Sequence, residues 1–146
     1  QTVIAGTKAG VDKACELLKA AGAKRALPLP VSAPFHSSLM KPAAEKLRMA
    51  LADVVLAVPQ IPVLNNVDVA VQQDADAIRD ALYRQAFGAV RWVECVQALK
   101  GRGITHIIEC GPGKVLAGLT KRIDPELVGA ALFDPATLAE TRELLA

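Results

Sequence analysis

The segment PVSAPFHSSLM, residues 30–40, places one histidine on a loop that two prolines stiffen. Each proline fixes φ and lacks an N–H, so both keep the chain extended and away from the centre of a sheet. Ser37 and Ser38 can cap the helix that the next residues predict, and Pro42 fits its first turn. His36 on this rigid loop suits a general base, which must be held in place before its basicity matters. A loop histidine without a chemical role fits the same pattern.

The chain on either side of this loop alternates between helical and strand periodicity. Residues 9–21 repeat apolar side chains at i, i+3, i+4 and i+7, and residues 40–54 carry a second apolar stripe, so both predict amphipathic helices. Strands that alternate with helices predict an α/β fold with a largely parallel sheet. Further helices are expected at 77–87, 90–99, 115–123 and 135–145, and strands at 2–5, 26–31, 61–65, 104–109 and 127–132.

The bulk composition indicates a globular protein without an evident nucleic-acid or membrane role. The 146 residues are 52% hydrophobic and 22% charged, and the net charge of +2 is too small to favour nucleic acid. The start of the chain resembles the inside of a strand rather than a signal peptide, and no apolar run reaches the roughly 20 residues of a spanning helix. Cys15, Cys95 and Cys110 share no metal-ligand spacing, so we expect reduced thiols, no metal and a cytoplasmic location.

Several ordered motifs accompany the histidine segment: VIAG at 3–6, AKRALPLPV at 23–31, NNVDV at 65–69 and ECGPGKVL at 109–116. With these motifs, the chain resembles the C-terminal half of malonyl-CoA:acyl carrier protein transacylases, the acyltransferases of fatty-acid and polyketide synthesis. The resemblance implies the C-terminal part of an α/β-hydrolase-like acyltransferase domain.

The same resemblance implies a division of the chain between two subdomains. Residues 1–32 would form the second half, a βαβ unit, of a ferredoxin-like small subdomain. Residues 33–146 would form the C-terminal part of the large α/β acyltransferase subdomain.

In that family a serine attacks malonyl-CoA, and a histidine takes its proton and later that of the carrier's phosphopantetheine thiol, without a cofactor. By resemblance His36 is this base. The serines of this chain are Ser32, Ser37 and Ser38, and none lies in a Gly-x-Ser-x-Gly elbow. The nucleophile would therefore belong to the missing N-terminal half, and this chain alone is not expected to be active.

The resemblance also implies roles for the neighbours of the base. In the family a backbone carbonyl orients the histidine ring, and the match to the Arg84–Gln85 pair assigns this carbonyl to Gln85. Asn65 or Asn66, at the end of a predicted strand, is an alternative orienting group. Phe35, directly before the base, would form a wall of the acyl pocket and bind substrate.

Two basic pairs, far apart in the sequence, are candidates for docking the acidic carrier protein. In the family, basic residues at positions matching Lys24, Arg25, Lys121 and Arg122 lie beside the cleft where the carrier binds. An ordinary solvated surface explains the same charges. The expected partners are therefore acyl carrier protein, a coenzyme A thioester and the missing N-terminal half.

Other interpretations remain open at this point. The GPGK segment at 111–114 has the look of a phosphate loop but lacks the Walker spacing, and by resemblance it is a turn whose following helix could help to hold a diphosphate. The chain could also come from a polyketide acyltransferase that takes another acyl-CoA. A non-catalytic carrier-docking module and a phosphate-binding protein are further alternatives.

Overall fold

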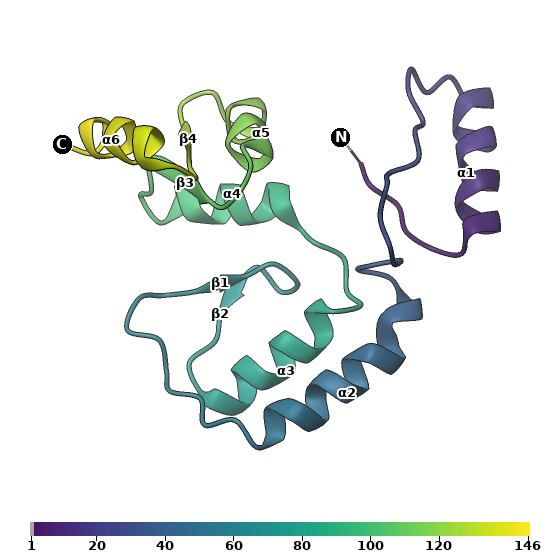
Figure 1. Ribbon diagram of the computed structural model, residues 1–146, viewed down its shortest axis with the longest axis horizontal. Helices are drawn as coiled ribbons and strands as arrows, with labels where there is room; N and C mark the ends of the chain where they lie inside the picture. The colour runs from purple at the N-terminus through teal and green to yellow at the C-terminus, as the bar shows by residue number, and fades with distance from the viewer. Residues whose placement is uncertain (1) are drawn as a thin grey trace. The chain divides into compact units, whose positions relative to one another are not determined.

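The computed structural model describes residues 2–146, and the chain divides into two compact units, Gln1–Val90 and Arg91–Ala146. Two helices of the first unit begin with side-chain caps: Thr7 accepts a hydrogen bond from the amide of Gly10, and Asp74 from that of Ala77. Its elements, in chain order, are α1 (Lys8–Ala20), the 3-10 helix η1 (Ser38–Met40), α2 (Lys41–Ala52), β1 (Leu64–Asn65), β2 (Ala70–Val71) and α3 (Ala75–Gln85) (Figure 1).

The strands expected in the first unit are mostly not formed. Residues 2–5 and 26–31 lie outside any strand in the described part of the chain, and the strand expected at 61–65 is reduced to the two residues of β1. β1 pairs with β2 in a short antiparallel hairpin, with Leu64 opposite Val71. A strand exists only where a second strand supplies its hydrogen bonds, and for residues 2–5 and 26–31 the described chain supplies none.

The predicted serine cap of the helix after His36 is also wrong. The hydroxyl of Ser37 donates instead to the carbonyl of Pro34, at 2.6 Å, and α2 begins after Met40 without a side-chain cap. Pro42 does lie in the first turn of α2, as expected for a residue without an N–H. Ser37 thus closes the turn that carries His36 and does not start the helix.

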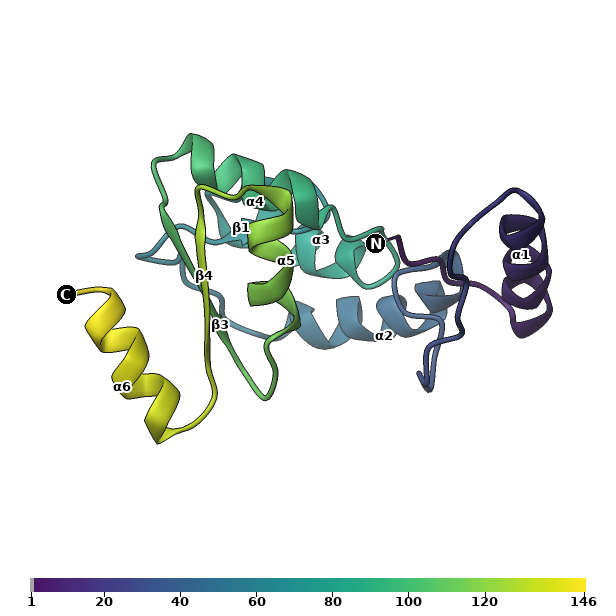
Figure 2. The ribbon, with the colours of Figure 1, turned by 90° about the horizontal axis from the view of Figure 1, so that it is seen from above.

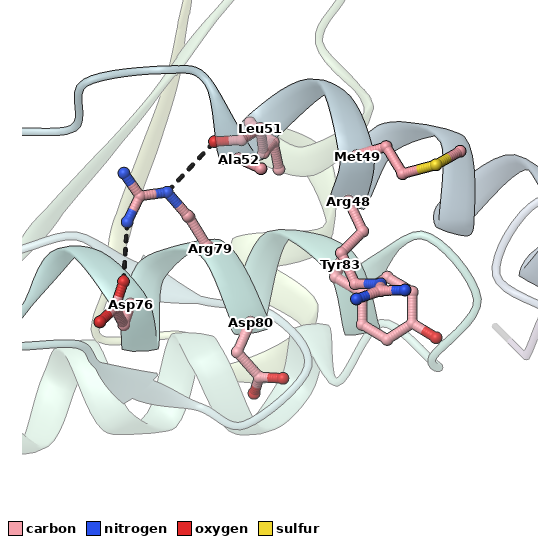
Figure 3. Close-up of a pocket in the computed structure, with 8 residues that line it drawn as sticks. All are labelled: Arg48, Met49, Leu51, Ala52, Asp76, Arg79, Asp80 and Tyr83. Carbon is pink, nitrogen blue, oxygen red and sulfur yellow. Dashed lines mark hydrogen bonds and ion pairs between the residues drawn. The ribbon is translucent and has the colours of Figure 1, made fainter.

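Polar side chains join α2 to α3. Nε of Arg79 donates to the carbonyl of Leu51 at 3.1 Å, and its Nη2 donates to that of Val54 at 2.8 Å. The last carbonyls of a helix have no partner inside it, so Arg79, from α3, satisfies the end of α2. Figure 3 shows this side chain between the Leu51 carbonyl and Asp76. Farther along, the hydroxyl of Tyr83 donates to Glu45 at 2.5 Å.

The second unit is built on a parallel pair of strands. β3 and β4 run side by side (Figure 1, Figure 2) over five paired positions, from His106 opposite Val128 to Cys110 opposite Leu132. Helices α5 and α6 pack against β4, and Pro135 fits the first turn of α6. The elements are α4 (Trp92–Gly101), β3 (His106–Cys110), α5 (Val115–Ile123), β4 (Val128–Leu132) and α6 (Pro135–Leu144).

The core of the second unit is small but close-packed. Val96 and Thr120 are fully buried, and Cys95 and Leu127 are 3% exposed. Gly129 of β4 lies so close to α5 that a methyl group there would come within 2.5 Å of the carbonyl oxygen of Ala117. The glycine therefore sets how near the helix approaches the sheet.

The observed elements support the expected fold class. The strands expected at 104–109 and 127–132 and the helices expected at 115–123 and 135–145 are confirmed within two residues at each end. Two parallel strands connected through a helix are the unit from which α/β folds are built. Throughout the part of the chain that the structure describes, no helix combines the length and the apolar composition needed to cross a membrane.

Candidate active site

His36 lies at the tip of the proline-stiffened turn in an unusual backbone conformation. Its φ is +57°, in the left-handed region that few non-glycine residues occupy. The hydrogen bond from Ser37 to the Pro34 carbonyl closes the turn around it. The residue is exposed, so its ring is accessible to a reacting group.

Two backbone carbonyls hold the ring of His36 from one side. Its Nδ1 lies 3.0 Å from the carbonyl oxygen of Gln85 and 3.2 Å from that of Gly88. A carbonyl oxygen only accepts hydrogen bonds, so Nδ1 must carry the hydrogen and be the donor. In the neutral ring, Nε2 then keeps its lone pair, and it is the nitrogen that can take a proton.

The end of α3 supplies these carbonyls. The turn that follows the helix is closed by the amide of Gly88, which donates to the carbonyl of Arg84 at 2.8 Å. The carbonyl of Gln85, in the last turn, accepts from the histidine side chain, as the free carbonyls of a helix end can. The sequence singled out Gln85 through its resemblance to the family, but it did not single out Gly88. The only signal for Gly88 is that a glycine ends the predicted helix.

Gly88 could not be replaced without moving its surroundings. A methyl group there would lie 2.7 Å from Cγ2 of Val67 and 2.9 Å from the carbonyl oxygen of Arg84. Real Cβ atoms do not approach other atoms so closely, so the loop between β1 and β2 packs directly on the turn after α3. This contact fixes the second carbonyl that faces His36.

The two asparagines considered as alternative orienting groups lie in the β1–β2 hairpin. Asn65 donates to the carbonyl of Ala70 at 2.8 Å and accepts from the amide of Asp68 at 2.8 Å, so it organises the hairpin loop. Oδ1 of Asn66 is buried without a hydrogen-bond partner among the described residues. Nδ1 of His36 forms its hydrogen bonds with the backbone carbonyls of Gln85 and Gly88 instead.

Asp68 and Arg84 form an ion pair beside these carbonyls. Nη1 and Nη2 of Arg84 lie 2.5 and 2.7 Å from the two carboxylate oxygens of Asp68, and its Nε lies 2.6 Å from Asp80. Hydrogen bonds to Asp68 and to Asp80 raise the pKa of Arg84 above its ordinary value, so the guanidinium stays charged at every working pH.

The other predicted site residues lie on the surface. Phe35, next to His36, is 51% exposed. Lys24 and Arg25 follow α1 in the first unit, whereas Lys121 and Arg122 lie in the last turn of α5 in the second. All four basic residues are exposed.

The glycine loop at 111–114 is poorly suited to hold a diphosphate. The carboxylate of Glu109 accepts a hydrogen bond from the amide of Ala117, at 2.9 Å, at the start of α5. A helix N-terminus binds phosphate through free amides and a positive dipole end, and here a carboxylate already occupies one amide and opposes a second anion. The expectation that α5 helps to hold a diphosphate is therefore disfavoured. Within residues 2–146, no group of histidine, cysteine and acidic side chains is arranged to bind a metal.

A hollow between α2 and α3 is lined by none of the predicted site residues, such as His36, Gln85 and Phe35. Figure 3 shows the eight side chains that line it, several of which belong to the polar contacts between the two helices. Each charged side chain of the lining has an ion-pair partner: Arg79 pairs with Asp76, Arg48 with Glu45 and Asp80 with Arg84. The hollow is a product of helix packing, and we assign it no ligand.

No protein-family model matches the chain. It is 55% identical over 139 residues to the malonyl CoA-acyl carrier protein transacylase of Salmonella typhimurium, which covers 95% of this chain and 45% of the relative. The transacylase of Escherichia coli strain K12 is 53% identical over 144 residues, which is 99% of this chain and 47% of the relative. The chain thus spans about half the length of the curated relatives it matches, and it aligns with their C-terminal part.

Solved structures give the same result. An acyl-carrier-protein S-malonyltransferase from Burkholderia pseudomallei superposes with a TM-score of 0.90 at 68% identity, over 94% of this chain and 45% of that one. A malonyl-transacylase in complex with a type II polyketide synthase acyl-carrier protein superposes with a TM-score of 0.91 at 51% identity, over 95% and 45% of the two chains. The resemblance indicated by the sequence motifs, and the α/β acyltransferase fold that it implies, are confirmed.

Proposed function

Because nearly the whole chain resembles the C-terminal part of malonyl-CoA:acyl carrier protein transacylases, we propose that it supplies the histidine base of such an enzyme. The reaction transfers malonyl from coenzyme A to the phosphopantetheine thiol of acyl carrier protein through a serine ester. The three serines of this chain lie outside any nucleophile elbow, so the reacting serine comes from a segment beyond these residues. We further propose that this is a cytoplasmic enzyme of fatty-acid biosynthesis.

His36 moves one proton in each direction during each half of the reaction. Its Nε2 takes the serine proton as the serine oxygen attacks the malonyl thioester carbon, and it returns that proton to the departing coenzyme A sulfur. In the second half it takes the proton of the phosphopantetheine thiol, whose sulfur attacks the serine ester. The proton then goes to the departing serine oxygen, and the free enzyme is restored.

The observation that carries this proposal is the pair of carbonyls on Nδ1. Hydrogen bonds to Gln85 and Gly88 set the tautomer of His36 and prevent its ring from turning. In many hydrolases a buried carboxylate performs this task, whereas here two neutral carbonyls do so. They lie at the C-terminal end of α3, where the partial negative charge of a helix interacts favourably with a ring that has taken up a proton.

The remaining site assignments belong to the same proposal. Phe35 forms a wall of the acyl pocket beside the base, and its ring leaves little room for a substituent on the malonyl α-carbon. Residues 1–32 belong to the small subdomain and 33–146 to the large one. The two basic pairs contribute to the surface that docks acyl carrier protein, whose acidic character their charges complement.

The proposal is tested by replacing His36 with alanine in the full-length enzyme that contains this chain. General-base assistance is worth roughly 10²–10⁴-fold, and a base that serves both half-reactions should lie near the upper end. We expect malonyl transfer to fall by that factor while the thermal unfolding midpoint changes little. His106→Ala, which removes the other histidine of the chain, is the matched control and should retain activity. Near-normal turnover by a folded His36→Ala enzyme would remove His36 from the mechanism.

A further inference from the structure

The ion pair of Asp68 and Arg84 has the geometry of a rigid clamp. Both ends of the guanidinium fork lie within 2.7 Å of the two oxygens of one carboxylate, an arrangement that fixes orientation as well as distance. The Arg84 side chain is 35% exposed and that of Asp68 is 27% exposed, so water screens this pair less than a surface pair. A second donor, Nε2 of the Gln72 side chain, also reaches the carboxylate of Asp68, at 3.2 Å.

The backbone of Arg84 is part of the turn that faces His36. Its carbonyl accepts from the amides of Phe87 and Gly88, at 3.3 and 2.8 Å, and the next residue is Gln85. The position of the Arg84 backbone therefore sets the direction of the Gln85 carbonyl and, through the closed turn, that of the Gly88 carbonyl. These are the two oxygens that hold Nδ1 of His36.

The other end of the clamp lies on a loop that is itself well held. The amide of Asp68 donates to the side chain of Asn65 at 2.8 Å, which fixes the loop from within. On the outside of the loop, Val67 packs so closely on Gly88 that a methyl group at Gly88 would not fit. The ion pair and this contact thus join the same loop to the same turn at two points.

From this arrangement we propose that Asp68 and Arg84 are positioning residues for the histidine base. They act on the ring through the turn that carries the Gln85 and Gly88 carbonyls. This inference rests on the proposed role of His36. Without the clamp the turn would shift and the ring would lose its orientation, and a misplacement of about 1 Å can cost roughly 10²-fold in rate. We expect binding of malonyl-CoA to be little affected, because the proposed action of the pair is on the orientation of the ring.

The test uses Asp68→Asn and Arg84→Met in the full-length enzyme. We expect each to lower kcat by about 10–100-fold with KM for malonyl-CoA changed less than about twofold. Because the two residues act as one unit, the double variant should be no slower than the worse single variant. Asp76→Asn, which removes an exposed ion pair from the same helix, is the matched control and should keep kcat within about twofold.

A readout that does not depend on activity distinguishes positioning from folding. The Nδ1 proton of His36, followed by NMR in histidine-labelled enzyme, should lose its hydrogen-bonded shift in the clamp variants and keep it in Asp76→Asn. If Asp68→Asn does not fold, Arg84→Lys carries the test, since it keeps the charge but loses the two-pronged contact. A kcat and a proton shift equal to those of the control would overturn the inference. If the clamp variants match the control in this way while His36→Ala is inactive, only the clamp is rejected and the proposed base stays in place.

Discussion

The two units of the chain are held together by different kinds of interaction. In Arg91–Ala146, helices pack on a parallel strand pair and bury four apolar side chains and two threonines. In Gln1–Val90 the buried apolar residues are only Ala44 and Ala81 among those described, and side chains bonded to backbone carbonyls join its elements. Apolar packing resists small shifts but does not depend on the orientation of the groups in contact. A hydrogen bond does depend on it, so it fixes the direction in which a group points. The unit that holds the His36 ring is the one built on hydrogen bonds.

The largest effect that this comparison predicts is on the stability of the second unit. Gly129→Ala would place a methyl group 2.5 Å from the Ala117 carbonyl oxygen and 3.1 Å from Cβ of Thr120. Overpacking of this kind costs about 1–3 kcal/mol or more, and a clash with helix backbone should lie at the upper end. Urea denaturation of the full-length enzyme measures this loss of unfolding free energy.

Gly118→Ala is the matched control for that experiment. A methyl group at Gly118, on the helix α5 that Gly129 faces, would meet nothing within 4 Å, and alanine favours helix over glycine by about 1 kcal/mol. We therefore expect Gly118→Ala to be neutral or slightly stabilising. Equal stability of the two variants would show that the packing of β4 on α5 is looser than described and that the contrast between the units is weaker.

Replacement of Phe35, in the first unit, is expected to have an intermediate effect. It should change the acyl-CoA specificity and leave stability largely unchanged. If Phe35 lines the acyl pocket as proposed, Phe35→Ser should shift the kcat/KM ratio toward methylmalonyl-CoA and away from malonyl-CoA by several-fold or more. One methyl group in such a pocket is worth roughly 1–3 kcal/mol. The side chain is half exposed, so the unfolding free energy should change little. An equal loss with both substrates would make Phe35 a packing residue.

The smallest effect concerns the two basic pairs, one in each unit. Reversal of Lys24 and Arg25 to glutamate should raise KM for the carrier about threefold and weaken its salt dependence, because surface charges steer encounter and are screened over roughly 8–10 Å. Hydrolysis of malonyl-CoA should be nearly unchanged. The same reversal at Lys121 and Arg122 shows whether the carrier is contacted by both units or by one. An equal loss of hydrolysis and transfer would mean that the fold or the acyl site was damaged instead.

Periodicity predicted the second unit well, because its elements bury apolar faces against one another. The helix expected at 115–123 has those bounds, and β4 begins one residue later than expected. In the first unit the same kind of pattern failed at 2–5 and 26–31. An apolar run indicates burial, but it does not say which strand will supply the hydrogen bonds.

The candidate site was predictable in its residues and in one of the two hydrogen bonds to the histidine ring. His36 and Gln85 followed from the resemblance, and the structure places them 3.0 Å apart, whereas their catalytic roles stay predictions. The second carbonyl, at Gly88, depends on how a turn closes in space, which no sequence spacing specifies. Ser37 was expected to cap a helix, but its hydroxyl reaches back to Pro34 because the left-handed residue before it reverses the chain.

That left-handed backbone has a consequence for how an inactive enzyme should be made. A non-glycine residue at φ +57° is held in a conformation that costs about 1 kcal/mol or more relative to glycine. Directed evolution for heat resistance alone would therefore be expected to replace His36 with glycine or asparagine, and to lose the base in doing so. The same preference makes asparagine a better choice than alanine for trapping a bound substrate, because it keeps the loop in shape while it removes the proton acceptor.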